Sequence, residues 1–90
     1  MAADLNWKVY MIQCSDHSLY TGITTDIAKR FQQHLTGKGA KFFYTCKPLK
    51  VVYMEEDHNR SSASQRENEL KKLTRKEKLQ LIAKTALPEF

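Results

Sequence analysis

The sequence predicts an α+β fold: a small three-stranded antiparallel or mixed sheet flanked by helices, in the order strand, strand, helix, strand, helix, helix. Alternating stretches rich in β-branched and aromatic residues indicate the strands, and apolar residues spaced four apart indicate the first helix. Two capping-box patterns mark the starts of the later helices. A chain of 90 residues has the length of one small domain, which we expect to span residues 1–90 with a core from about residue 7 to about residue 83.

The first two strands are predicted over Trp7–Cys14 and from Leu19 to about Thr24, because both stretches are rich in strand-forming residues. The segment SDHS between them is a turn cluster. Each strand carries one tyrosine, Tyr10 and Tyr20. The two phenols are either core aromatics or two groups directed into one site.

The length of the turn decides between these readings. If Ser15 paired with Ser18 across a two-residue turn, the two tyrosines would point to opposite faces, since side chains alternate along a strand. One extra residue in the turn, with His17 in the left-handed conformation, would put both phenols on one face. Gly22 would then let a phosphate or the first helix approach the strand closely.

The first helix is predicted over Ile27–Leu35, with Thr25 or Asp26 as the N-cap and Gly37 as a left-handed C-terminal cap. Its apolar stripe is expected to contain Ile27, Phe31 and Leu35. A loop or irregular stretch, AKFFYTCKP, follows at residues 40–48.

The third strand is predicted over residues 49–56 and is expected to be broken by DHNRSS. Ser62 followed by Gln65 is a capping-box pattern that opens a helix over about residues 63–73. Thr74 followed by Glu77 is a second one and opens a helix over residues 75–84. The tail TALPEF is expected to be frayed.

Composition excludes several classes of protein. No segment has the pattern of a signal peptide or the length of a membrane span, so we expect a cytoplasmic protein. Cys14 and Cys46 form no CxxC motif or Cys/His cluster, which argues against structural zinc and favours two free thiols.

The net charge is +5, and no acidic residue lies between Asp26 and Glu55. Aromatic residues are interleaved with the lysines of this interval, which suits a polyanion whose bases can stack. A lysine-rich surface that only faces solvent is the alternative reading. We expect nucleic-acid contacts from Lys29, Lys38, Lys41, Lys47 and Lys71.

Three polar residues occupy positions suited to chemistry. Arg30 and His34 share a helix face near the edge of the apolar stripe. Glu67 lies on or beside a stripe that contains Leu70 and Leu73, where a carboxylate needs an ion-pair partner, a hydrogen bond or a metal ion. An ion pair with a neighbouring Lys or Arg is the commoner arrangement.

Together with the two tyrosines, these residues are the parts that metal-assisted cleavage of a phosphodiester needs. An arginine neutralises the charge that grows on the phosphate. A carboxylate holds a divalent cation. A phenol or an imidazole takes the proton of the attacking water.

Five motifs of the chain resemble those of the GIY-YIG nuclease superfamily. They are VY at Val9 and Tyr10, YTG at residues 20–22, Arg30 with His34, TGKGAK at residues 36–41 and RENELK at residues 66–71. The resemblance covers about residues 7–82 and is strongest to small stand-alone bacterial members. It implies a single Mg²⁺ or Mn²⁺ ion held by Glu67 and a bacterial setting with DNA repair as the process.

The resemblance also implies the roles of the other site residues. Arg30 is the implied catalytic arginine, His34 an assisting residue, and Tyr10 or Tyr20 the general base. The chain departs from the family pattern at Lys8 and Thr21, and at Ile23, where some members carry a lysine. The segment FFYTC at residues 42–46 also departs from it.

The predicted function is a metal-dependent DNA endonuclease with weak sequence preference, acting as a monomer. A nucleic-acid-binding module without catalysis is the alternative, and a structural adaptor a third reading. Duplex, flap, branched or single-stranded DNA, or RNA, are all open as substrates.

Overall fold

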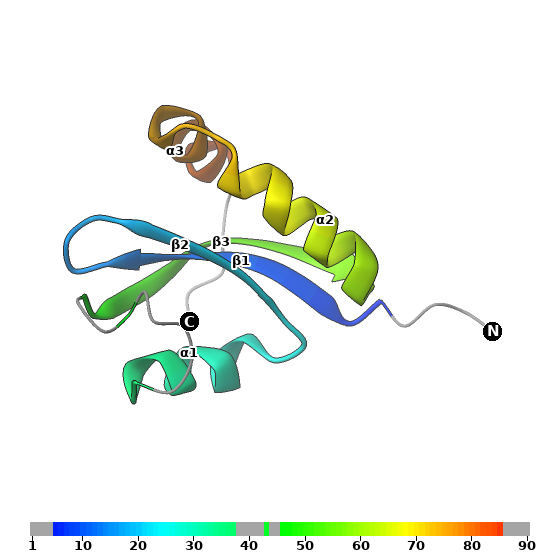
Figure 1. Ribbon diagram of the computed structural model, residues 1–90, viewed down its shortest axis with the longest axis horizontal. Helices are drawn as coiled ribbons and strands as arrows, with labels where there is room; N and C mark the ends of the chain where they lie inside the picture. Colours follow the sequence, from blue (N-terminus) through cyan, green and yellow to red (C-terminus); the bar gives the residue numbers. More distant parts are fainter. Residues whose placement is uncertain (1–4, 38–42, 44–45, 86–90) are drawn as a thin grey trace.

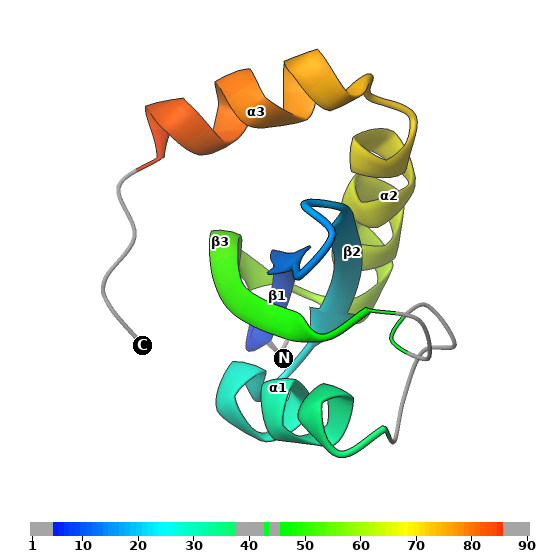
Figure 2. The same cartoon turned by 90° about the vertical axis from the view of Figure 1, so that its left-hand side faces the viewer.

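The computed structural model describes residues 5–37, 43 and 46–85. A three-stranded antiparallel sheet in the order β2-β1-β3 lies at its centre, built from β1 (Trp7–Cys14), β2 (Leu19–Thr24) and β3 (Pro48–His58). Helix α1 (Ile27–Leu35) lies on one side of the sheet, and α2 (Arg60–Lys71) and α3 (Arg75–Lys84) lie on the other (Figures 1 and 2). The α+β class and the order of elements are confirmed.

The turn between β1 and β2 contains the extra residue that a shared tyrosine face requires. Tyr10 is opposite Gly22 and Ile12 is opposite Tyr20, so both phenols lie on the same face of the sheet. The backbone N–H of Cys14 donates to the carbonyl of Ser18 at 2.9 Å, and His17 has φ 67°. The three-residue loop predicted as one of two possibilities is therefore the one present.

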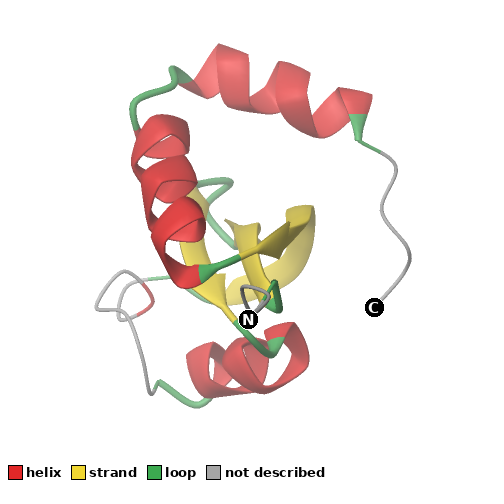
Figure 3. Ribbon diagram, turned by 90° about the vertical axis from the view of Figure 1, so that its right-hand side faces the viewer, coloured by secondary structure: helices red, strands yellow, loops and turns green. Residues whose placement is uncertain are grey.

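The sheet separates two cores. Tyr10, Ile12 and Cys14 point toward α1, where Ile27, Phe43 and Cys46 complete a buried cluster. Val9, Met11 and Tyr53 point to the opposite face and pack with Ala63 and Leu70 of α2. Figure 3 shows the sheet between these helices. Alternation along β1 thus sends successive residues into different cores. Both cysteines are buried free thiols, as predicted.

The boundaries of two elements, β3 and α2, differ from the sequence prediction at both ends. Strand β3 begins at Pro48 and continues through His58, so Asp57 and His58 do not break it. Register shifts against β1 and the positive φ of 62° at Asp57 absorb the irregularity that these polar residues suggested. Helix α2 begins at Arg60 because Asn59 is its N-cap, whereas Ser62 was predicted as the cap.

Helix α1 buries Ile27 and packs Phe31 against the core, as predicted, but the third residue of the predicted stripe differs. His34 is 2% exposed and lies in the core, whereas Leu35 is 48% exposed. The reason is non-local: the His34 ring meets a hydroxyl group of β1, described below, and this fixes the rotation of the helix. The predicted caps Asp26, Gly37 (φ 79°) and Thr74 with Glu77 are confirmed.

A polar cluster that the sequence did not reveal attaches α2 to β3. Arg66 Nε donates to Glu55 Oε2 at 2.8 Å, and the Tyr53 hydroxyl donates to the same oxygen. His58 Nε2 lies 3.0 Å from Glu55 Oε1. Burial opposes ionisation of Glu55, but these hydrogen bonds outweigh it and lower its pKa. Because Arg66 precedes Glu67, this cluster also fixes the height of Glu67 along the sheet.

Lys38, Lys41 and most of the predicted loop at residues 40–48 lie outside the described residues, as do residues 86–90 of the predicted frayed tail. Among the helices that the structure describes, none has the length and apolar character needed to cross a membrane.

The capping box of α2 supplies a test of this fold. Asn59 Oδ1 accepts from the Ser62 N–H at 2.8 Å, and Ser62 Oγ accepts from the Asn59 N–H at 3.1 Å. We expect Asn59→Ala to lower the free energy of unfolding by about 1 kcal/mol, because backbone donors of the first turn lose their acceptor. Urea unfolding measures the change. The exposed neighbour Ser61 provides the control: Ser61→Ala should leave stability unchanged, and equal stabilities for the two variants would contradict the assigned cap.

Candidate active site

The centre of the candidate site is the phenol of Tyr10, which is only 1% exposed. Its hydroxyl oxygen lies 3.0 Å from His34 Nε2. A Cβ atom added at Gly22 would lie 2.7 Å from the same oxygen, so the ring passes directly over the glycine of the neighbouring strand. Gly22 therefore accommodates the Tyr10 ring, not the phosphate or the helix that its sequence position suggested.

Aromatic rings surround this phenol. The centroid of Tyr20 lies 6.2 Å from that of Tyr10 and 5.3 Å from that of His34. Phe43 completes the group, with its centroid 4.8 Å from Tyr20 and 4.4 Å from His34. Phe43 was not singled out from the sequence as a site residue, since its segment gave no periodic pattern.

Burial sets the protonation of the central pair. It raises the pKa of Tyr10 far above its ordinary value, the nearby Tyr20 raises it further, and a hydrogen bond from Arg30 opposes the shift. Burial also lowers the pKa of His34 to about 4, and the positive charge of Arg30 acts in the same direction. Both groups are thus neutral near pH 7. A neutral pair is the form least costly to bury.

The two charged residues predicted for the site lie at its margin. Arg30 Nη1 donates to Gln33 Oε1 at 2.9 Å, and its guanidinium also reaches Tyr10. The charge of Glu67 acts on Tyr10 from α2. The Glu67 side chain is 21% exposed, and its Oε2 lies 3.4 Å from Lys71 Nζ. The ion pair considered from the sequence is therefore present, with Lys71 as its partner.

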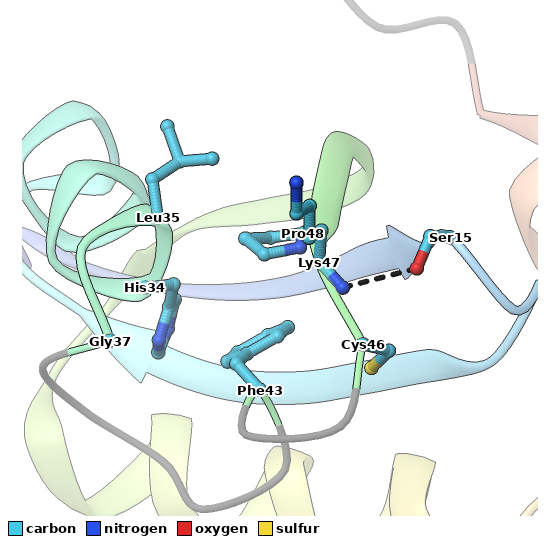
Figure 4. Close-up of a pocket in the computed structure, with 8 residues that line it drawn as sticks. All are labelled: Ser15, His34, Leu35, Gly37, Phe43, Cys46, Lys47 and Pro48. Atoms are coloured by element: carbon cyan, nitrogen blue, oxygen red, sulfur yellow. Dashed lines mark hydrogen bonds between the residues drawn. The ribbon is translucent and has the colours of Figure 1, made fainter.

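A hollow of about 490 Å³ lies between the C-terminal end of α1 and the start of β3, with His34 in its lining (Figure 4). Phe43 and Pro48 give it apolar walls, and Lys47 stands at its rim. Lys47 is tied to the turn through its backbone, which donates to Ser15 Oγ at 3.1 Å and leaves the side chain exposed. Among the described residues, His34 Nδ1 has no hydrogen-bond partner.

The structure thus brings Tyr10, Tyr20 and His34 together, and the charges of Arg30 and, least of all, Glu67 influence the pKa of Tyr10. Of the predicted nucleic-acid contacts, Lys29 and Lys47 are exposed, and Lys71 is 53% exposed and paired with Glu67. Lys38 and Lys41 lie outside the described residues.

Comparison with known proteins places this arrangement in a family. The profile of the GIY-YIG catalytic domain matches residues 6–80. The chain is 40% identical over 89 residues to a UPF0213 protein of Cupriavidus necator, covering 99% of this chain and 97% of that protein. It is 46% identical over 81 residues to a UPF0213 protein of Clostridium perfringens, covering 90% and 87% of the two chains.

Solved structures agree. The solution NMR structure of a UPF0213 protein from Bacillus halodurans superposes with a TM-score of 0.57 at 36% identity, covering 91% of this chain and 87% of that one. The solution NMR structure of a protein from E. faecalis gives a TM-score of 0.59 at 28% identity, covering 100% and 99%. The residues that match the family include the two strands, the helix and the RENELK segment that carry the candidate site. The chain therefore belongs to the GIY-YIG family, of which its relatives named UPF0213 are small members.

Proposed function

We propose that this protein is a divalent-metal-dependent endonuclease that hydrolyses phosphodiester bonds of DNA with weak sequence preference. The observation that carries the proposal is the cluster of two phenols and His34 around one buried hydroxyl, whose pKa the charges of Arg30 and Glu67 also influence. The match to the GIY-YIG catalytic domain, a nuclease-type domain, supports the same function. Weak preference follows because a chain of 90 residues has little surface beyond the site with which to read base edges.

The residues divide the work by charge. Arg30 is a permanent cation at the margin of the site and would neutralise charge that grows on the phosphate. His34 is neutral and fixes the orientation of the Tyr10 hydroxyl through the 3.0 Å hydrogen bond. Tyr10 is 1% exposed and its pKa is raised, so this phenol is buried, protonated and suited to holding the neighbouring side chains in place. Tyr20, the less buried phenol, is then the better candidate to accept a proton from water.

Glu67 fits the requirements of a Mg²⁺ or Mn²⁺ ligand. Mg²⁺ is commonly held by one or two carboxylates, with substrate phosphate and water as the other ligands. Among the described residues no group of three or more His, Cys, Asp or Glu side chains converges, which suits an ion that depends on the substrate for its remaining ligands. When bound, such an ion polarises a phosphoryl oxygen and stabilises the leaving oxygen.

One observation favours the second candidate, a nucleic-acid-binding module without catalysis. The ion pair between Lys71 and Glu67 gives the carboxylate a structural partner that requires no metal. Removing the charge of Glu67 distinguishes the two functions, because only the metal-dependent nuclease would need this charge for its activity.

We expect Glu67→Gln to abolish metal-dependent nicking of a supercoiled plasmid while folding is retained. The amide is nearly isosteric but a far poorer ligand for a hard cation. The single ion pair with the exposed Lys71, at 3.4 Å, contributes little to stability, so the melting temperature should stay level. Glu69→Gln is the matched control on the same helix, since Glu69 is exposed, also has an ion-pair partner, Arg66, and should be dispensable for nicking. A destabilised but active Glu67→Gln protein would refute the metal site.

Binding to duplex DNA should weaken steeply with salt. Each phosphate neutralised by a lysine releases counterions, so log K falls by about 0.9 per contact for each unit of log salt concentration. We expect Lys29→Ala and Lys47→Ala each to reduce this slope by about 0.9, because both side chains are exposed. Fluorescence anisotropy at several salt concentrations measures the slope. A slope near zero for the unmodified protein would exclude nucleic acid as its ligand.

His34 should make stability depend on pH. Its pKa in the folded protein is about 4, below the ordinary value of about 6.5, so the unfolded state binds more protons between these values. The free energy of unfolding should therefore fall as the pH is lowered from about 6.5 toward 4. Urea unfolding of His34→Gln should lack this component, while the exposed-turn control His17→Gln should keep it. An unchanged pH slope in His34→Gln would disprove the assignment.

A further inference from the structure

A second, smaller hollow adjoins the candidate site at the N-terminal end of α1. It has a volume of about 290 Å³ and is lined by residues of β1, β2 and α1, among them Trp7, Ile23, Lys29 and Arg30. Arg30 therefore belongs to both places: its guanidinium reaches the Tyr10 hydroxyl, and its side chain forms part of this wall.

Trp7 contributes an aromatic ring to the lining of this hollow. It is the single tryptophan of the chain and is only partly buried. The guanidinium carbon of Arg60, on α2, lies over the ring at 5.8 Å from its centroid. A ring supported by an arginine and by the core contacts of β1 is held in place, and such a ring offers a base a stacking surface without sequence preference.

The charge around the hollow suits a nucleotide. Lys29 and Arg30 bring positive charge to its α1 wall, and Ile23 adds an apolar surface. The one carboxylate there, Asp26, is occupied in capping α1, where Oδ1 accepts from the Lys29 N–H at 3.1 Å. Apolar surface for a base and cations for its phosphates are thus present within one small volume.

We propose that this hollow binds one unpaired nucleobase, stacked against Trp7, beside the phosphate that Arg30 contacts. The inference rests on the proposed function and names its substrate class: a strand with an unpaired nucleotide at the site, as in a single strand, a flap or a branch. A continuous duplex does not fit, because its bases are stacked and paired and only an extruded base can enter such a pocket.

The single tryptophan allows this to be tested without catalysis. In EDTA, an oligothymidylate and a forked duplex with a thymidine flap should quench the Trp7 fluorescence, and a blunt duplex of the same length should quench it several-fold less. The Glu69→Gln protein should behave identically, since it retains Trp7 and all residues of the candidate site. Equal quenching by blunt and forked DNA, or binding by anisotropy with no quenching, would overturn the stacking site.

Variants separate stacking from simple charge attraction. Trp7→Leu should weaken binding of the oligothymidylate about tenfold, because one stacked base is lost. Its salt slope should stay unchanged, because no phosphate contact is removed. Trp7→Phe keeps a ring and should retain most of the affinity, and it controls for damage to the fold. An oligonucleotide with abasic sites should bind wild-type protein and Trp7→Leu equally.

These outcomes are independent of the proposed catalysis. Base-dependent quenching without any nicking in Mg²⁺ or Mn²⁺ would leave the stacking site standing and remove the nuclease. Nicking of blunt duplex with no effect of Trp7→Leu on any substrate would leave the nuclease standing and remove the stacking site.

Discussion

The packing of the Tyr10 ring over Gly22 determines the rest of the site. A Cβ atom at position 22 would lie 2.7 Å from the Tyr10 hydroxyl oxygen, which is too close. Glycine at this position of β2 therefore lets the Tyr10 ring of β1 extend across the neighbouring strand. The hydroxyl then stands where α1 passes, and His34 meets it at 3.0 Å. That bond turns α1 so that His34 is buried and Leu35 faces solvent, which in turn brings Arg30 to the margin of the site.

The same packing separates neutral from charged groups. Tyr10 and His34 are shielded from water and neutral, while Arg30 and Glu67 remain where solvent or a substrate can reach them. The neutral pair costs little to bury, whereas the charged Arg30 and Glu67 stay partly exposed. The buried neutral residues of the cluster therefore hold its shape, and the charged residues at its margin are the ones that can react. In our proposal a polyanion meets positions that the core has already fixed.

Patterns within a segment predicted most of this fold, and contacts between segments account for what they missed. The alternation in β1 and the capping box at Thr74 are local and were predicted, and the turn with His17 was one of the two turns considered. His34 is buried in place of Leu35 because its ring bonds to a hydroxyl 24 residues away in sequence. Helical periodicity cannot predict such a contact. The Glu55 cluster and the ring of Phe43 are likewise non-local, and Asn59 competed with Ser62 for the same capping pattern. The site residues were identified by motif, whereas the role of Gly22 required coordinates.

The position of β2 at the edge of the sheet has a consequence for solubility. An edge strand offers unpaired backbone groups to other chains, and charged side chains are a common protection against this. The opposite edge strand, β3, carries Lys50, Glu55, Glu56 and Asp57, but β2 has no charged residue in LYTGIT. The free edge of β2 therefore lacks the charged side chains that β3 carries, and it is the edge at which another strand would add most readily.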